Sequence, residues 1–149
     1  MRNEVIKRSD MRYFDMAKKV AEHSDFGPIK MGCVLVYQGK VISLGCNSRK
    51  TSPAQKRYNR YRQFNKGSKP IQHSNHAELA AIKAVPYTVA QTIDWKRVKM
   101  FIYRMAPGLP NGMGCAKPCP GCMALIKDMG IQDIYYSDTD GYCYQKIVY

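Results

Sequence analysis

Two short motifs, each at the start of a predicted helix, constrain this chain more than any other feature. They are His76-Ala77-Glu78 and Pro118-Cys119-Pro120-Gly121-Cys122. One imidazole and two thiolates suit zinc, and three protein ligands leave the fourth tetrahedral position open for water, as in catalytic zinc sites. Glu78 lies two residues from His76, where a carboxylate can reach that water and move a proton without binding the metal. The motifs therefore predict one zinc ion held by His76, Cys119 and Cys122, with Glu78 as the catalytic acid and base.

A closed structural zinc site is the alternative. Cys115 lies four residues before Cys119 and offers a fourth ligand. Such a site has no position for water and no need of a glutamate at position 78. The remaining cysteines, Cys33, Cys46 and Cys143, are expected to be buried thiols.

The hydrophobic pattern predicts helices and strands in the order α, ββ, α, β, α, ββ. The predicted helices cover Asp10–His23, His76–Val85 and Cys119–Met129, and the predicted strands cover Cys33–Tyr37, Val41–Leu44, Val98–Tyr103, Ile131–Ser137 and Tyr142–Val148. Ser9 or Asp10 is expected to cap the first helix, and Ala106–Gly114 to form a loop. No repeat or low-complexity linker interrupts the pattern, so residues 1–149 are predicted to be a single domain.

The charge of the chain is strongly unbalanced. The sequence has 24 Lys and Arg against 11 Asp and Glu, a formal net charge of +13, which favours anionic partners. No acidic residue lies between Asp25 and Glu78, and the basic residues of this segment are Arg49, Lys50, Lys56, Arg57, Arg60, Arg62, Lys66 and Lys69. Tyr58, Tyr61 and Phe64 recur among them at every third position.

This basic segment has two interpretations. In the functional one the aromatic rings stack on bases while cations hold phosphates. In the structural one an aromatic face packs beneath a solvated basic face. The candidate phosphate or nucleic-acid contacts are Arg49, Lys50, Arg57, Arg60 and Tyr61.

The location of the protein is predicted from its apolar runs. None approaches the roughly 20 residues that a membrane span requires, and the first residues lead to no apolar signal segment. We therefore expect a cytoplasmic protein with no membrane partner, in which the six cysteines are thiols or metal ligands.

The two motifs resemble the H-x-E…P-C-x-x-C signature of the zinc-dependent cytidine and deoxycytidylate deaminase superfamily, and the resemblance extends from about Phe26 to Tyr136. It implies a three-layer α/β/α sandwich around a central mixed five-stranded sheet. It also implies that the backbone at Ala77 helps to hold the base and that Asn47 contacts the sugar. Tyr136, on the strand after the second motif, is a candidate for stacking on the base, with core packing as the alternative.

The resemblance implies hydrolytic deamination of a cytosine-type base to uracil, with a free (deoxy)cytidine nucleotide such as deoxycytidylate as the expected substrate. One alternative is a base-editing deaminase acting on single-stranded DNA, RNA or tRNA. Another, of a different class, is a non-catalytic, zinc-stabilised nucleic-acid-binding module. Free-nucleotide deaminases commonly form dimers or larger assemblies, so the resemblance is compatible with a homo-oligomer.

Three departures leave the subgroup open. Deoxycytidylate deaminases usually have Asn two residues after the motif glutamate, where this chain has Ala80, and Met105–Lys117 inserts a loop before Pro118. The predicted closing hairpin after Ser137 is more like the free-cytidine branch, which usually shows Cys-Ala-Glu in place of His-Ala-Glu.

Overall fold

The computed structural model describes residues 6–27, 29–50, 53–60 and 75–148. Its helices are α1 (Arg8–Ala21), α2 (Pro53–Asn59), α3 (Ala77–Ala84), α4 (Tyr87–Thr92), α5 (Pro120–Met129) and the short 3₁₀ helix η3 (Trp95–Arg97). Its strands are β1 (Lys30–Tyr37), β2 (Lys40–Cys46), β3 (Val98–Met105), β4 (Met113–Gly114), β5 (Asp133–Asp138) and β6 (Gly141–Lys146). Within these ranges no helix is long and apolar enough to span a membrane.

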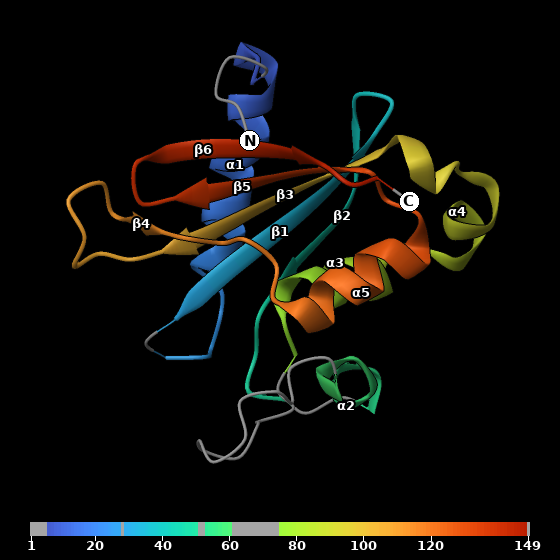
Figure 1. Ribbon diagram of the computed structural model, residues 1–149, viewed down its shortest axis with the longest axis horizontal. Helices are drawn as coiled ribbons and strands as arrows, with labels where there is room; N and C mark the ends of the chain where they lie inside the picture. The colour runs from blue at the N-terminus through green and yellow to red at the C-terminus, as the bar shows by residue number, and fades with distance from the viewer. Residues whose placement is uncertain (1–5, 28, 51–52, 61–74, 149) are drawn as a thin grey trace.

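The strands form one mixed sheet in the order β2-β1-β3-β5-β6, with the short β4 paired to β3 outside this path (Figure 1). β1 pairs antiparallel with β2 and β3, β5 lies parallel to β3, and β6 pairs antiparallel with β5. The crossover that makes β3 and β5 parallel contains α5. The predicted mixed sheet and its closing hairpin are confirmed, and β4 is added to them.

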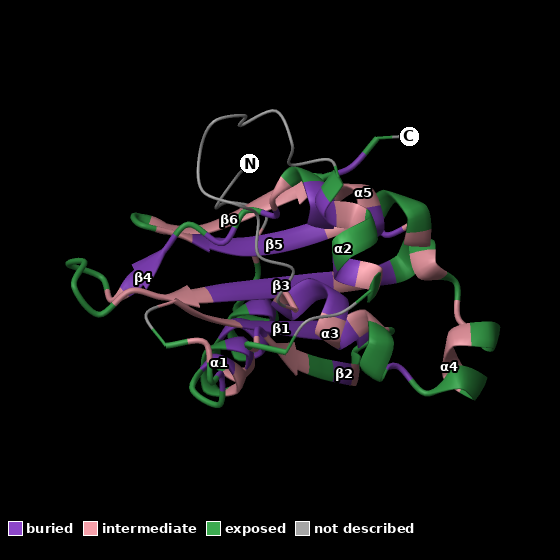
Figure 2. Cartoon of the chain, turned by 90° about the horizontal axis from the view of Figure 1, so that it is seen from below, coloured by how far each residue is buried: buried purple, intermediate pink, exposed green. Residues whose placement is uncertain are grey.

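Helices cover both faces of the sheet, as the alternation of side chains along each strand requires. Cys33 and Leu35 of β1 belong to a core with residues of α3 and α5, which we call the site-side core. Val34 and Val36 point the other way into a core with residues of α1, the α1-side core. Figure 1 shows α1 behind the sheet and α3 and α5 in front, and Figure 2 shows β3 and β5 buried along most of their lengths. The predicted three-layer α/β/α sandwich is confirmed.

The ends of the elements differ from the prediction in two places. The Asp10 carboxylate accepts a hydrogen bond from the backbone N–H of Lys7 at 2.9 Å, so α1 begins at Arg8 and Lys7 occupies the cap position. The expectation that Ser9 or Asp10 caps this helix is therefore wrong, since Asp10 acts from the third helical position.

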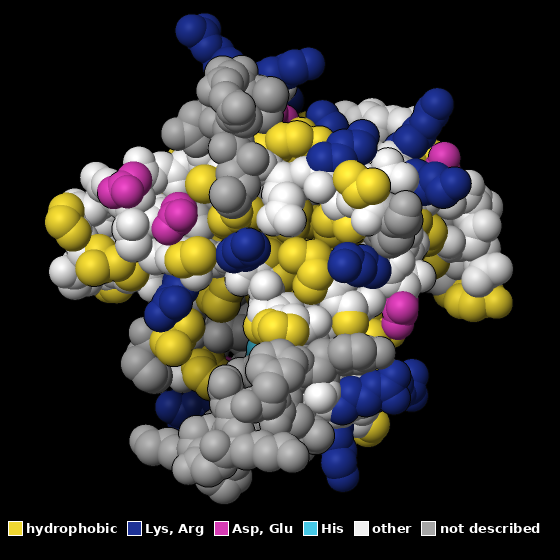
Figure 3. Space-filling view, in the orientation of Figure 1, with side chains coloured by type: hydrophobic (Ala, Val, Ile, Leu, Met, Phe, Trp, Pro, Cys, Tyr) yellow, Lys and Arg dark blue, Asp and Glu magenta, His cyan; other side chains and the backbone are white. Residues whose placement is uncertain are grey.

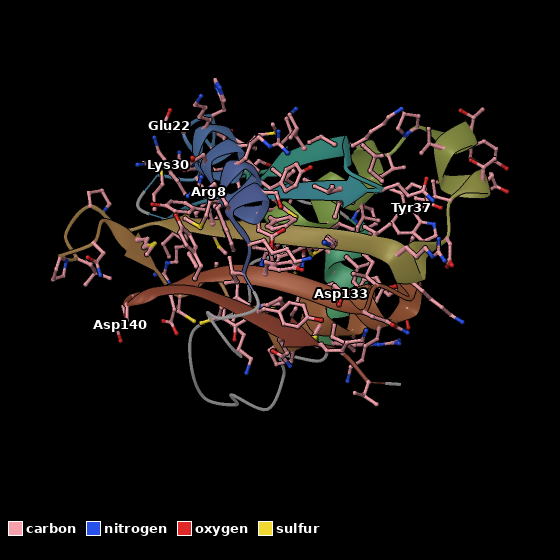
Figure 4. All side chains as sticks on the ribbon, turned by 90° about the horizontal axis from the view of Figure 1, so that it is seen from above. Arg8, Glu22, Lys30, Tyr37, Asp133 and Asp140 are labelled. Atoms are coloured by element: carbon pink, nitrogen blue, oxygen red, sulfur yellow. The ribbon has the colours of Figure 1, made fainter. Side chains whose placement is uncertain are left out.

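The second difference follows Pro86. This proline ends α3 as predicted but also begins α4, because its fixed backbone geometry suits a helix start. The chain then returns through η3 to β3. Just before η3, the Asp94 N–H donates to the Tyr37 hydroxyl at 3.2 Å. Figure 4 shows Tyr37 at the α4 end of β1 and Lys30 at the opposite end.

Candidate active site and metal centre

The predicted zinc ligands lie at the starts of two helices on the same face of the sheet. His76 is the N-cap of α3 and Cys119 is the N-cap of α5, whose first turn holds Cys122. The backbone N–H of Cys122 donates to Cys119 Sγ at 3.5 Å. Helix starts expose unpaired N–H groups and favour negative charge, so the first turn of α5 stabilises the thiolate forms of the two cysteines.

The three donor atoms lie close together. All are within 4.8 Å of one another, and His76 Nδ1 lies 3.2 Å from Cys122 Sγ and 3.7 Å from Cys119 Sγ. Tetrahedral zinc with bonds of about 2.3 Å to sulfur and about 2.05 Å to nitrogen places N and S about 3.6 Å apart. The donor set and its spacing therefore fit one zinc ion.

The protonation of the two thiols also fits metal binding. A hydrogen bond from the Cys122 thiol, aided by His76 and the Cys122 N–H, lowers the pKa of Cys119 to about 3. The same contact with Cys119, together with burial, raises the pKa of Cys122. Without metal the pair thus shares one proton, which zinc binding displaces.

Glu78 lies beside the donor atoms but is not one of them. Its side chain is 2% exposed, and burial raises the pKa of its carboxyl, an effect that the nearby His76 opposes. Among the described residues, the only group of three or more side chains placed to bind one metal ion is His76, Cys119 and Cys122. Cys115 is exposed and stands outside this group, so the structure favours the open three-ligand site over the closed four-ligand alternative.

A cavity of about 320 Å³ opens in front of the donor group. His76, Glu78 and Cys119 line it, together with the cationic side chains of Arg104 and Lys117. Ligand sites typically range from about 300 to 1,000 Å³, so this cavity suits a small molecule. Sequence reasoning missed Arg104 and Lys117, because neither belongs to a motif or to the basic run before Glu78.

Asn47 also lines the cavity, and its amide fixes the wall. Asn47 Oδ1 accepts hydrogen bonds from Ser24 Oγ at 2.6 Å and from the Met31 N–H at 3.0 Å. Its Nδ2 donates to the Ile29 carbonyl at 2.8 Å. Asn47 therefore holds residues 24–31 in place, and its contact with a sugar stays a prediction.

The other two predicted substrate contacts lie differently. The Ala77 side chain is fully buried in the site-side core, while its backbone N–H belongs to the first turn of α3. Tyr136 is 1% exposed, belongs to the same core and does not line the cavity. The position of Tyr136 fits core packing and gives no support to stacking on a base.

The comparisons with known proteins agree with this geometry. A model of the cytidine and deoxycytidylate deaminase zinc-binding region matches residues 7–138. The chain belongs to this deaminase family. The predicted zinc cofactor and the predicted enzyme class, a hydrolytic deaminase, are thereby confirmed, and the non-catalytic interpretation is not.

Solved structures share the fold of this deaminase at low sequence identity. The dCMP deaminase from the cyanophage S-TIM5 in apo form is 19% identical, with 93% of this chain and 86% of that chain covered and a TM-score of 0.55. The same phage enzyme in complex with dCMP and dUMP is 18% identical, with 93% and 84% covered and a TM-score of 0.52. A cytidine deaminase from Burkholderia pseudomallei is 16% identical, with 98% and 93% covered and a TM-score of 0.57. A search of curated proteins finds no significant match.

A buried glutamine of the deaminase supports the zinc ligand His76. Gln55 of α2 is 1% exposed, and its Oε1 accepts the backbone N–H of His76 at 3.0 Å. Its Nε2 donates to Asn59 Oδ1 at 2.9 Å, which fixes the orientation of the amide. Gln55 sits within the basic segment, where the sequence drew attention only to cations and aromatic rings.

Replacing Gln55 with leucine is expected to weaken zinc binding by roughly 10- to 100-fold, the usual cost of removing a partner that orients a metal ligand. Leucine keeps most of the volume but offers no acceptor to the His76 N–H. Competition with a chromogenic zinc chelator measures the affinity. Lys56→Leu, an exposed neighbour on α2, is the control, and equal affinities of the two variants would contradict the positioning role of Gln55.

The candidate phosphate contacts that the structure describes lie on the surface, in α2 or within a few residues of it in the sequence. Arg49, Lys50, Arg57 and Arg60 are exposed, and other Lys and Arg side chains spread across the face shown in Figure 3. Tyr58 does not join them, since its hydroxyl donates to Asp128 Oδ2 of α5 at 2.8 Å. Tyr61, Phe64 and the basic residues after them lie outside the described residues, so the rest of the predicted aromatic stripe stays a prediction.

Proposed function

We propose that this deaminase converts cytosine to uracil in a free (deoxy)cytidine nucleotide, with deoxycytidylate as the leading substrate. The observation that supports this most is the cavity of about 320 Å³, whose lining includes two of the zinc donors, Glu78 and two cationic side chains. A cavity of this volume suits a ligand of the size of a mononucleotide. The cyanophage dCMP deaminase, whose complex with dCMP and dUMP shares this fold, supports the same substrate class.

The residues of the chain divide the reaction between them. His76, Cys119 and Cys122 would hold the zinc ion, which when bound would supply water activated near neutral pH. Glu78 moves both protons of the attacking water, one to ring nitrogen N3 and the second to the amine at C4 as the carbon–nitrogen bond breaks and ammonia leaves. The new oxygen at C4 comes from water, so the products are uracil and ammonia.

Two further residues orient the substrate in this proposal. The backbone of Ala77 lies one residue from His76 and one from Glu78, at the helix start where N–H groups lack intrahelical partners, and it holds the base. Asn47 contacts the sugar through its second Nδ2 hydrogen, which makes no bond to any other residue in the described ranges.

A base-editing deaminase is the second candidate, and one packing contact favours it. A Cβ added at Gly121 of α5 would lie 2.8 Å from the Tyr58 carbonyl oxygen, so α2 packs directly against the zinc-binding helix. This brings the helix that includes Arg57, with Arg60 just beyond its end, close to the active site. Cations in that position suit the backbone of a polynucleotide.

One assay separates the two candidates. Zinc-loaded protein is given deoxycytidine, deoxycytidylate and a single-stranded oligonucleotide containing cytosine, and uracil formation is measured from about 50 to 200 mM salt. We expect turnover of deoxycytidylate with a shallow salt dependence. Preference for the oligonucleotide with a steep loss of affinity at higher salt would establish editing instead. Absence of turnover on all three would overturn the proposed reaction.

A further inference from the structure

Two cations line the active-site cavity, and the described part of the chain gives neither side chain a partner. Arg104 comes from the end of β3, and Lys117 lies two residues before the zinc ligand Cys119. Among the described residues neither side chain forms an ion pair or a hydrogen bond. Among the described residues that line the cavity, the only carboxylate is that of Glu78, which is 2% exposed. An anion entering this cavity therefore meets two cations that form no ion pair with any side chain in residues 6–27, 29–50, 53–60 and 75–148.

The glycine opposite Arg104 sets the path of its side chain. Arg104 pairs with Gly114 across β3 and β4. A Cβ added at Gly114 would lie 3.1 Å from Arg104 Cδ and 3.2 Å from Nε, closer than ordinary contact allows. The arginine side chain thus runs over the glycine, and the absence of a side chain at position 114 gives it this space.

Ser137 joins the backbone at Arg104 to the backbone of the segment that leads to Lys117. Its hydroxyl accepts the Arg104 N–H at 3.0 Å and donates to the Gly114 carbonyl at 2.8 Å. Its carbonyl accepts the Ala116 N–H at 2.8 Å. One residue of β5 therefore ties the end of β3 to the inserted segment that leads to Lys117 and Cys119.

We infer that Arg104 and Lys117 bind the 5′-phosphate of the nucleotide and determine the preference of this enzyme for a nucleotide over a nucleoside. The inference deepens the proposed function and rests on it. Arg104 suits the role because a guanidinium binds phosphate through two parallel hydrogen bonds. Lys117, near the α5 end of the β3–α5 connection, adds a second positive charge to the lining of the cavity.

The test is the ratio of kcat/KM for deoxycytidylate to kcat/KM for deoxycytidine. Arg104→Gln is expected to lower this ratio roughly 10- to 100-fold, the value of a charge-assisted hydrogen bond pair, chiefly by raising KM for the nucleotide. The matched control is Arg97→Gln. Arg97 is exposed and directly precedes β3, so this substitution removes the same charge outside the cavity. The ratio of the two kcat/KM values is expected to stay at the wild-type value.

A second variant tests the path of the arginine without removing its charge. Gly114→Ala places a methyl group against the Arg104 stem, so we expect the ratio to fall several-fold while zinc content stays at wild type. A wild-type ratio in both Arg104→Gln and Gly114→Ala would overturn the inference and leave the proposed function intact. Failure of the proposed function is recognised separately, because wild-type enzyme would then deaminate neither deoxycytidylate nor deoxycytidine.

The oligonucleotide distinguishes the source of the phosphate. If the cations recognise a terminal nucleotide phosphate, Arg104→Gln lowers turnover of deoxycytidylate and leaves turnover of an internal cytosine, where measurable, less affected. A larger loss on the oligonucleotide than on deoxycytidylate would overturn the assignment to the 5′-phosphate of a free nucleotide.

Discussion

Glu78→Gln is expected to yield a folded, zinc-bound protein whose deaminase turnover is lower by at least about 10²- to 10⁴-fold, the usual contribution of a general acid and base. Glutamine has nearly the shape of glutamate but cannot carry a proton between N3 and the departing amine. Zinc is expected to remain because the Glu78 carboxylate is outside the group of donor atoms. Uracil formation and the zinc content per chain are measured on the same preparation.

The control for this variant is Glu22→Gln, an exposed carboxylate at the end of α1 that does not line the cavity. Loss of zinc from Glu78→Gln would show that Glu78 supports the metal centre itself. Turnover near the wild-type rate would show that another group moves the protons, and either result contradicts the role assigned to Glu78.

Cys119→Ser is expected to abolish stoichiometric zinc binding and, with it, deaminase activity. At free zinc 100-fold above Kd, binding stabilises the folded state by about 2.7 kcal/mol. For a domain of this size that corresponds to a fall in Tm of roughly 5–10 °C. Metal analysis and thermal unfolding with and without a chelator check both effects, since chelation of the wild type is expected to reproduce the Tm of the variant.

Cys115→Ser is the matched control, because it removes a thiol next to the same cavity but outside the donor group. It is expected to keep one zinc ion per chain. If Cys115→Ser lost zinc as completely as Cys119→Ser, the site would have four protein ligands and no open position for water, and the catalytic interpretation would fail.

The sequence predicted the parts of the site that local chemistry determines. His76 and the two cysteines stand at helix starts, and donor type and spacing within a short motif specify zinc on their own. The order of strands and the closing hairpin followed from hydrophobic pattern and turn residues. The sheet topology confirms the predicted strands and hairpin, and the family model together with the His/Cys/Cys group confirms the zinc cofactor.

The parts that the sequence did not predict depend on contacts between distant segments. Gln55 reaches His76 across 21 positions, and Ser137 reaches the Arg104 N–H across 33 positions. No local pattern encodes such pairs, because one glutamine or serine resembles any other until the fold brings its partner near. Tyr136 shows the same limit, since strand alternation does not reveal whether a buried face meets a cavity or a core.

The two cores on opposite faces of the sheet affect how this enzyme can change over generations. In the α1-side core, Phe14 stacks on Tyr142 and meets Phe101 edge to face, and this core contributes no residue to the cavity. Substitutions there alter the free energy of unfolding while the zinc donors keep their positions on the far side of β1 and β3. Substitutions on one face can therefore raise the free energy of unfolding. This gain can offset the destabilising effect of substitutions that create new substrate contacts in the β3–α5 connection on the other face.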